Sequence, residues 1–482
     1  MVTPNSSKAA WWIKDNYSRE EIDQLVQWGL EHFWTQNHQM ADLVAPGGYN
    51  IMVRGDDCYV YDIEGNKYID AMGGLFLKNI GHSHPEIATA VAEQMTALAY
   101  TNSGAYSSVP GILLSKKLAE ITPGDMNRVF FCGGGSEAVE IALKMARQYQ
   151  YIAGYPQKTK VISRRGQYHG STRGAMSVGS AGRRNAGLFE AMIPPGTIQV
   201  DPPYCYRCPW GFTDRTNNDC CMQSPRSIEN VIKAENADSI AAFIATPIPS
   251  GSQIPADEYW PAVREICDKN NIVFIADEII CGFGRLGTWF GMQRFGVEAD
   301  IMTIAKALTG GELPVGAVVA TKKIAETFDN AEGSNGAFQH GVTYGGHPAV
   351  MTAALKNIEI IERNNLVENS DKMGQYLYER AMSVLQENHP IVGHVGGGLG
   401  LLMSIEIVRN RKTKETYPGG PQGEYARKFT EKIRGYGLAT RAGDSITLSP
   451  PLTITKSIID DIIDILDKSM GEMEQEFPPD NA

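Results

Sequence analysis

Asp277 and Lys306 are the residues whose types and positions point most directly to chemistry. Each follows an apolar run, at residues 272–276 and 301–305, that is about as long as a buried parallel strand. The carboxyl ends of such strands are where open α/β sheets bind ligands. A lysine there can form a Schiff base and a carboxylate can hold a pyridinium nitrogen, and pyridoxal phosphate (PLP) requires both groups. Either residue alone is more typical of a solvated strand end, so the prediction depends on the motifs around the pair.

A glycine-rich turn supplies a candidate phosphate site. Residues 133–135 are all glycine and follow a predicted strand at residues 129–132, and Ser136 comes next, where a helix is predicted to begin. Glycines let the backbone approach an anion closely, and a helix N-terminus offers free N–H groups. The turn is not a P-loop, because no Gly-Lys-Ser/Thr follows. The alternative is a tight turn with Ser136 as the N-cap of the helix.

Three further positions suit a cofactor or a substrate. Tyr168, followed by His169, comes after a predicted strand, where an aromatic ring can stack on a flat cofactor. Thr343 lies in a glycine-rich segment at residues 340–348, and its hydroxyl suits an anion contact. Arg441 is a lone arginine beside a predicted turn. The alternatives are a packed core tyrosine, a linker between domains and a surface arginine.

Residues 282–287 formally match the dinucleotide-binding pattern G-x-G-x-x-G, but their context does not. The turn of that motif should follow its strand almost at once and open a helix. Here residues 277–281 intervene, and residues 288–291 do not begin a convincing helix. A nicotinamide oxidoreductase therefore stays only a remote alternative.

Four cysteines lie close together in a segment rich in Pro, Asn and Asp: Cys205, Cys208, Cys220 and Cys221. Such a set can hold zinc or form a disulfide. Adjacent Cys220 and Cys221 can rarely both ligate one tetrahedral ion, and no second C-x-x-C follows. We expect thiols with no metal, while both alternatives stay open.

The composition is that of an ordinary soluble globular protein, with 43% apolar and 21% charged residues. A length of 482 residues predicts two or three domains. The formal charge is 44 − 55 = −11 without a basic patch, which argues against nucleic acid and anionic membranes as partners. Neither a signal peptide nor a membrane span is expected, so we predict a cytoplasmic protein with reduced cysteines.

Alternating strands and helices must position these motifs. From about residue 85 to 320 the alternation predicts a mostly parallel sheet flanked by helices. A capping box at Ser18 predicts an N-terminal helix, and residues 57–70 read as a hairpin. A smaller α+β unit follows, with an exposed loop at residues 411–423, a strand at 401–408 and helices near 349–364, 371–386, 424–436 and 456–473.

The order and spacing of these motifs resemble those of class III aminotransferases, the ω-transaminase branch of fold-type-I PLP enzymes. The similarity runs from about Asn50 to Thr455. Its strongest segments are residues 129–147 (VFFCGGGSEAVEIALKMAR), 168–170 (YHG), 275–287 (IADEIICGFGRLG), 300–311 (DIMTIAKALTGG), 340–348 and 441–451. The resemblance implies PLP as the cofactor.

It also implies a two-domain α/β fold. A large domain at residues 76–344 would hold a mostly parallel sheet flanked by helices. A small α+β domain would combine an N-terminal segment, residues 1–75, with a C-terminal segment, residues 345–482.

The same resemblance implies roles at the reactive end of the cofactor. Lys306 would form the Schiff base and shuttle the proton. Asp277 would pair with the pyridine nitrogen and keep it protonated. Ile279 would pack under the ring, Tyr168 would stack above it, and the adjacent His169 belongs to the same cofactor-binding set.

At the phosphate, Gly135 and Ser136 would bind through the helix N-terminus, while Gly134 replaces a frequent serine and supplies no side-chain donor. Thr343 would reach the phosphate of the neighbouring subunit, which makes the active unit a homodimer or homotetramer. Arg441 stands where this branch carries a mobile arginine that grips an acidic substrate and swings away for an uncharged amine.

Other positions concern the substrate. Phe76 and Tyr168 would line its pocket, with Phe76 where many relatives have tryptophan. Thr246 stands where glutamate is usual, and Glu312 begins a sequence that replaces Tyr-x-Pro. Residues 202–211 resemble the Tyr-Cys-Tyr-Arg-Cys-Pro segment of taurine–pyruvate aminotransferases and their ω-amino acid–pyruvate relatives.

We therefore expect a ping-pong aminotransferase that moves an amino group from an ω-amino acid, an aminosulfonate or an amine to pyruvate. Taurine and β-alanine are favoured, because either anion fits the fork of Arg441. The alternative is a class III enzyme of another reaction type, such as an aminomutase, racemase or decarboxylase.

Overall fold

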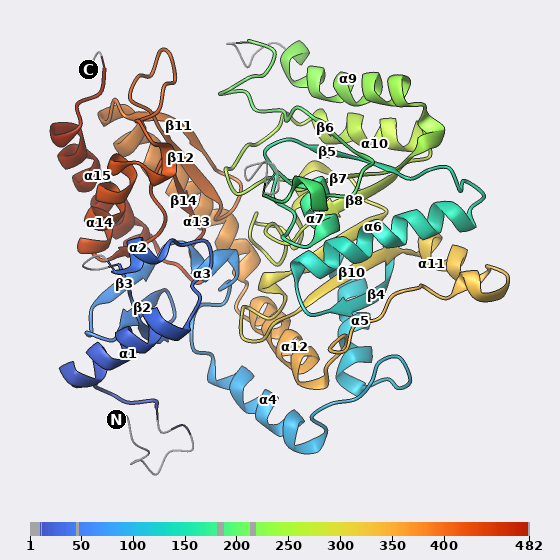
Figure 1. Cartoon of the computed structure of the whole chain (residues 1–482), viewed down its shortest axis with the longest axis horizontal. Coiled ribbons are helices and arrows are strands. Elements are labelled where there is room, and N and C mark those ends of the chain that lie inside the picture. The colour runs from blue at the N-terminus through green and yellow to red at the C-terminus, as the bar shows by residue number, and fades with distance from the viewer. Residues whose placement is uncertain (1–9, 11, 45–47, 181–187, 213–217, 481–482) are drawn as a thin grey trace.

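The computed structural model describes residues 10, 12–44, 48–180, 188–212 and 218–480. Figure 1 shows two units side by side. One contains a large sheet with helices on both faces. The other combines the N-terminal strands with the C-terminal helices and strands, so the two ends of the chain meet in one unit.

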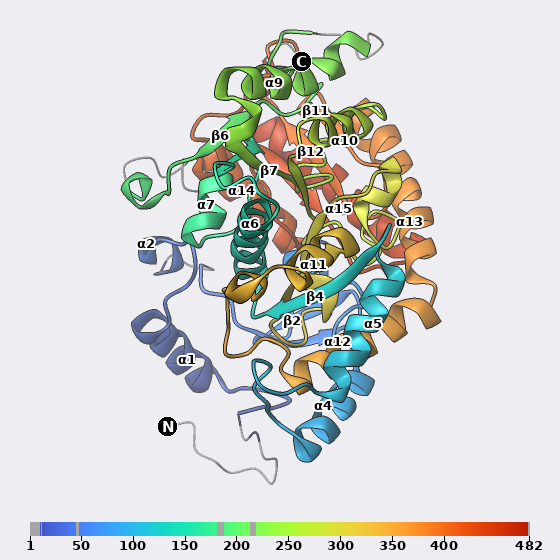
Figure 2. The same cartoon turned by 90° about the vertical axis from the view of Figure 1, so that its right-hand side faces the viewer.

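The large sheet carries the residues predicted to do chemistry. Its strands, in spatial order, are β4 (Met126–Cys132), β10 (Gly316–Thr321), β9 (Ile301–Ala305), β8 (Val273–Asp277), β7 (Ile240–Ala245), β5 (Lys160–Arg164) and β6 (Thr197–Val200). The strands from β9 to β6 are parallel, and β10 runs antiparallel to both of its neighbours. β4 forms the edge nearest the viewer in Figure 2.

Both faces of this sheet are covered, which explains its uninterrupted apolar strands. In β8, Val273 and Ile275 pack in the core beneath α6, whereas Phe274 and Ala276 pack in the core on the opposite side. By the same alternation Asp277 lies on the α6 side of the sheet. The helices around the sheet are α5 (Val109–Ile121), α6 (Gly135–Ile152), α7 (Arg173–Val178), α9 (Asn218–Glu235), α10 (Tyr259–Lys269), α11 (Lys322–Asp329) and α12 (Pro348–Arg363).

The second unit joins distant parts of the chain. Its N-terminal sheet has the order β1 (Met52–Asp56), β2 (Tyr59–Asp62), β3 (Lys67–Asp70) and β13 (Leu438–Ala439). The pairing of β13 with β3 is parallel and links the C-terminal segment to the N-terminal one. The remaining elements of this unit are β11 (Val392–Gly396), β12 (Met403–Ile407), β14 (Ser445–Leu448), α1 (Arg19–His32), α2 (Met40–Val44), α3 (Gly73–Phe76), α13 (Leu366–Arg380), α14 (Glu424–Gly435) and α15 (Lys456–Glu476). Helix α4 (Pro85–Ala97) packs instead against α12.

Most predicted elements are confirmed, with differences at their ends. The capping box at Ser18 is present, since its hydroxyl accepts from the Glu21 N–H and the Glu21 carboxylate accepts from the Ser18 N–H. The alternative of Ser136 as a helix N-cap is wrong, because Gly134 holds that position. The predicted helix at 371–386 starts earlier and ends in a π-helical turn, η6 (Ala381–Gln386). The domain boundaries stay predictions.

The cysteine-containing insertion packs against the second unit. The Tyr206 ring stacks on His394 of β11, with ring centroids 5.1 Å apart. Arg207 Nε lies 2.8 Å from the carboxylate of Glu406 in β12, and the Tyr204 hydroxyl also donates to that carboxylate. The insertion therefore connects the two units.

The structure describes two of the four clustered cysteines, Cys205 and Cys208, which are not joined in a disulfide. The side chains of Cys220 and Cys221 lie outside the described residues. Within the described part of the chain, no three His, Cys, Asp or Glu side chains form a metal-binding group. None of the helices described is both long and apolar enough to span a bilayer.

Candidate active site

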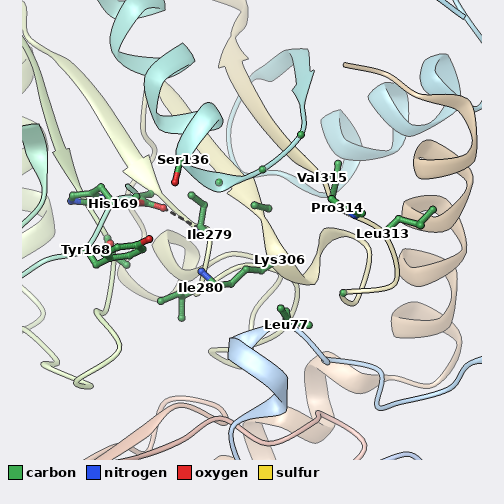
Figure 3. Close-up of a pocket in the computed structure, with 18 residues that line it drawn as sticks. Leu77, Ser136, Tyr168, His169, Ile279, Ile280, Lys306, Leu313, Pro314 and Val315 are labelled. Carbon is green, nitrogen blue, oxygen red and sulfur yellow. Dashed lines mark hydrogen bonds and ion pairs between the residues drawn. The ribbon is translucent and has the colours of Figure 1, made fainter. Parts of the chain in front are cut away.

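A cavity of about 380 Å³ opens at the carboxyl ends of β8 and β9. Most of the predicted cofactor residues line it: Gly134, Gly135, Ser136, Tyr168, His169, Asp277, Ile279 and Lys306. Figure 3 shows their side chains around the Lys306 amine. Strand ends, the start of α6 and two loops thus meet at one place, as the topology of an open α/β sheet requires.

Several hydrogen bonds hold the side chain of Asp277 in the cavity wall. Its carboxylate lies 2.6 Å from His169 Nδ1 and accepts from the Thr303 hydroxyl and the Ile279 N–H, both at 3.2 Å. The Thr303 contact follows from strand register, because Asp277 and Thr303 are paired residues of parallel β8 and β9. Asp277 and His169 are both buried. The neighbours therefore fix the direction of the carboxylate while leaving some of its lone pairs for another donor.

Lys306 follows directly after β9 with a φ of 41°, a left-handed conformation that is uncommon for a residue with a side chain. Its amine has no hydrogen bond or ion pair within the described part of the chain. Burial lowers the pKa of the Lys306 ammonium, and the nearby carboxylate of Asp277 opposes that shift. The lower pKa increases the fraction of unprotonated amine, which is the nucleophilic form.

The glycine turn leaves room for an anion in front of α6. A Cβ atom on Gly134 would meet no atom within 4 Å, whereas a Cβ on Gly135 would come within 3.0 Å of Ile279. The first N–H groups of α6 have no acceptor inside the helix. The Ser136 hydroxyl accepts from the Ser171 N–H at 3.1 Å, which leaves its own proton free to donate.

The fit to PLP follows from these three groups. A carboxylate of fixed direction, an unpaired amine with a lowered pKa and an anion-binding helix start line the same cavity. PLP presents a ring nitrogen, an aldehyde and a phosphate, which need a carboxylate, an amine and an anion site. The residues present therefore suit the cofactor.

The structure separates Asp277 from its neighbour Glu278. Glu278 is buried and its carboxylate accepts the N–H groups of Gly291 and Met292, both at 2.8 Å. Burial raises the pKa of Glu278 to about 7, although the two backbone hydrogen bonds oppose the shift. Glu278 therefore stabilises the loop after β8 and does not line the cavity.

Three of the predicted residues do not line this cavity: Phe76, Thr343 and Arg441. Phe76 is buried in a cluster with Met72, Ile248 and Leu402. Arg441 and Thr343 are exposed, and the Thr343 carbonyl accepts from the Tyr100 hydroxyl at 2.9 Å.

The cavity also has lining residues that the motifs did not predict, chiefly Leu77, Gly311, Leu313, Pro314 and Val315. They come from the segments before α4 and after Lys306, and none of the five has a charged or hydroxyl side chain that would have indicated a site. Thr246, noted only as a departure from glutamate, lines the cavity as well. Its carbonyl accepts from buried Arg164, and its N–H donates to Gln167 at 3.1 Å.

Residues 44–470 match the family model of aminotransferase class III. The protein is a class III aminotransferase. This aminotransferase is 37% identical over 431 residues to a putrescine–pyruvate aminotransferase of Pseudomonas aeruginosa, covering 88% of this chain and 91% of that protein. It is 36% identical over 477 residues to a taurine–pyruvate aminotransferase of Bilophila wadsworthia, covering 96% and 99%.

Solved structures agree with this assignment. An (S)-enantioselective ω-transaminase of Thermomicrobium roseum superposes with a TM-score of 0.88 at 35% identity, covering 95% of this chain and all of that one. A PLP-bound amine transaminase of an uncultivated Pseudomonas species gives a TM-score of 0.86 at 34% identity, covering 92% and 99%. The predicted family, fold type I, transferase class and PLP cofactor are confirmed.

Proposed function

We propose that this aminotransferase moves an amino group from an ω-amino acid, an aminosulfonate or an amine to pyruvate by a ping-pong mechanism, with taurine or β-alanine as the favoured donor. The observation that carries the proposal is the placement of Lys306 and the Asp277–His169 pair in one cavity with the glycine turn. The pyruvate acceptor is supported by two relatives whose names specify pyruvate, one of them with taurine as its donor.

The chain's residues would divide the reaction between them. PLP, when bound, supplies an aldehyde for the amino group and a ring that accepts an electron pair. Lys306 would take the proton from the carbon that bears the donor's amino group and return it on the cofactor side. Asp277, held by His169 and Thr303, would keep the ring nitrogen protonated. Ser136 and the start of α6 would bind the phosphate.

The substrate's own anion needs a cation. Among the described residues that line the cavity, Lys306 is the one lysine or arginine, and the chemistry occupies it. Arg441 is exposed and has a planar fork that suits a carboxylate or a sulfonate. We therefore keep Arg441 as the proposed anchor for an acidic donor, reached by a movement of its loop.

A donor panel tests the proposed reaction. The purified enzyme is supplied with pyruvate and, separately, taurine, β-alanine, 4-aminobutyrate, putrescine or 1-phenylethylamine. We expect alanine to form in an amount equal to the donor lost, with the highest kcat/KM for taurine or β-alanine. Nitrogen retained in the product, or release of CO₂ from the donor, would reject transamination in favour of another class III reaction.

We also propose that the active unit is a homodimer or a homotetramer in which Thr343 contacts the neighbouring subunit's cofactor. Apolar side chains near this segment are exposed on the single chain: Tyr344, Tyr106, Val109, Ile112 and Leu113. Such a set is unusual on the surface of a monomer and typical of an interface.

Light scattering after size exclusion tests the oligomeric state. A mass of one chain, 52.7 kDa, at micromolar concentration would contradict the proposal. Thr343→Ala should weaken cofactor binding about tenfold, because one hydroxyl bond to the phosphate is lost. Unchanged cofactor affinity in this variant would contradict the role of Thr343 but not the oligomer.

A further inference from the structure

Two loops meet at the end of the cavity away from the Asp277–His169 pair. Leu77 comes from the segment after α3, whereas Gly311 and Leu313 come from the segment after Lys306. In the view of Figure 3, Leu77 and Leu313 lie on the far side of Lys306 from His169. Since the cofactor must contact both Asp277 and the start of α6, these loops border the space that remains for a substrate.

An ion pair joins the two loops beside the cavity wall. Lys78 Nζ lies 2.7 Å from Glu312 Oε1, and the two side chains are only 10% and 24% exposed. Water therefore screens this pair less than an exposed one, and separating the charges costs more. Lys78 follows Leu77 directly, and Glu312 lies between Gly311 and Leu313, so the pair connects the wall residues themselves.

Other side-chain hydrogen bonds hold each loop to a different part of the molecule. On the first loop, the side-chain amide oxygen of Asn79 accepts from the Arg285 guanidinium at 2.6 Å. On the second, Asn357 of α12 donates to the Ala307 carbonyl at 2.8 Å. Neither bond joins one loop to the other, whereas the ion pair does.

In the cavity wall, Leu77 also packs against the backbone of Gly311. A Cβ atom on Gly311 would lie 2.0 Å from Leu77 Cδ1, and the φ of Gly311 is 74°, a conformation that favours glycine. Leu77 therefore occupies the space that a side chain at 311 would need. A change at either position alters the wall.

We propose that Lys78 and Glu312 are positioning residues: their ion pair holds Leu77 and Leu313 in the cavity wall and thereby restricts the size of the amine donor that reaches Lys306. The inference rests on the proposed function in one respect, that an amine of the ω class is the donor. It adds a determinant of donor size that is separate from the proposed anion anchor, Arg441.

Glu312→Gln breaks the ion pair while keeping the size of the side chain. With pyruvate as acceptor, kcat and KM are measured for β-alanine as the small donor and 1-phenylethylamine as the bulky one. We expect the ratio of kcat/KM for the bulky to the small donor to rise at least about fivefold, since apolar wall contacts discriminate donors by about tenfold or more. The cofactor content should stay the same, because Lys306 and Asp277 are unchanged.

Two further variants sharpen the test. Gly311→Ala displaces Leu77 without removing either charge and should change the same ratio. The double variant Lys78→Glu with Glu312→Lys restores an ion pair with reversed charges and should bring the ratio back toward the wild-type value. Glu235→Gln is the matched control, because it breaks a Lys160–Glu235 pair that is also 2.7 Å long but does not line the cavity.

The outcomes separate the two proposals. If the wild type uses none of the amines with pyruvate, the proposed function fails. If it uses them but Glu312→Gln and Gly311→Ala leave the ratio within twofold, the positioning role is overturned. Equal loss for both donors, or a charge reversal that restores nothing, would also overturn it, because a merely structural pair would behave in that way.

Discussion

The two ends of the active-site cavity are formed by different kinds of structure, strand ends on one side and loops on the other. At the sheet end, Asp277, His169 and Thr303 are buried, and the backbone pairing of β8 with β9 sets the distance between Asp277 and Thr303. At the loop end, Leu77 and Leu313 come from segments more than 200 residues apart that one ion pair joins. The sheet end holds the groups for the reaction in fixed positions, whereas the loop end can change its shape without disturbing the sheet.

This difference has a chemical consequence. The groups that PLP needs lie on strand ends and a helix start, where backbone hydrogen bonds limit movement. The groups proposed to select the donor, including exposed Arg441, lie on loops. Substitutions at the two ends should therefore affect different kinetic parameters.

The largest effect is expected for Lys306→Ala. Turnover should fall by roughly 10⁴-fold or more, because no second lysine is among the cavity-lining residues that the structure describes, to hold the cofactor and move the proton. Borohydride reduction should no longer fix the cofactor to the protein, as measured by mass spectrometry. Lys372→Ala, at an exposed lysine of α13, serves as control and should keep full activity. Near wild-type turnover in the Lys306 variant would remove the assignment.

Asp277→Asn should have the next largest effect. We expect kcat to fall roughly 10²- to 10³-fold, because a neutral amide cannot keep the ring nitrogen protonated. Glu278→Gln is a close comparison, since that carboxylate is adjacent in sequence and binds two backbone N–H groups outside the cavity. It should lower thermal stability and leave kcat within about threefold. Similar loss of kcat in both variants would contradict the distinction between the two carboxylates.

Arg441→Ala probes the loop end. KM for taurine or β-alanine should rise about 10- to 100-fold, because a charge-assisted contact to the donor's anion is lost. The kcat/KM for 1-phenylethylamine should change less than about threefold, since that donor has no anion. Equal effects on both classes of donor would show that Arg441 supports the fold and does not anchor the substrate.

The smallest effect concerns stability in the second unit. Buried His389 lies 3.0 Å from Asp467 and 3.1 Å from Glu474 of α15. Burial opposes its charge, but hydrogen bonds to the two carboxylates outweigh burial and raise the pKa of His389 above its usual value of 6.5. The cluster should therefore stabilise the fold fully below about pH 6.5 and lose that contribution as the pH rises through the raised pKa.

His389→Gln should remove this pH-dependent part, on the order of 1 kcal/mol, in urea unfolding measured from pH 6 to pH 9. Activity at fixed pH should be unaffected, because His389 does not line the cavity. If the wild type and the variant show parallel stability profiles over this range, the cluster does not titrate as described.

Local patterns were sufficient for the sheet end. The apolar runs before Asp277 and Lys306 predicted buried strands, and the open α/β architecture then required their carboxyl ends to lie together. The glycine turn before Ser136 was recognisable for the same reason, since a strand, a turn and a helix are adjacent in the chain. Local pattern did not show that Gly134 is the N-cap, because that depends on backbone angles at the turn.

Other features depended on contacts between distant segments. Phe76 was expected at the substrate, but its side chain packs in a core cluster and its neighbour Leu77 lines the cavity. Residue types do not show which of these two adjacent side chains faces the cavity. That depends on the φ and ψ values of a short helix that contains left-handed residues. The hydrogen-bond partners of Glu278 could not be predicted from the sequence either, because the fold of a loop brings the N–H groups of Gly291 and Met292 to its carboxylate.

The sequence by itself determined the reaction class of this protein: Asp277, Lys306 and the turn before Ser136 carry their chemistry in residue type and in their position at the ends of local elements. Only the tertiary structure decided which loops line the other end of the cavity. Lys78 and Glu312 are 234 positions apart, and nothing near either residue indicates the other. The two residues meet because the packed core brings the two loops together, and the approach of segments so distant in sequence depends on the folding of the whole chain.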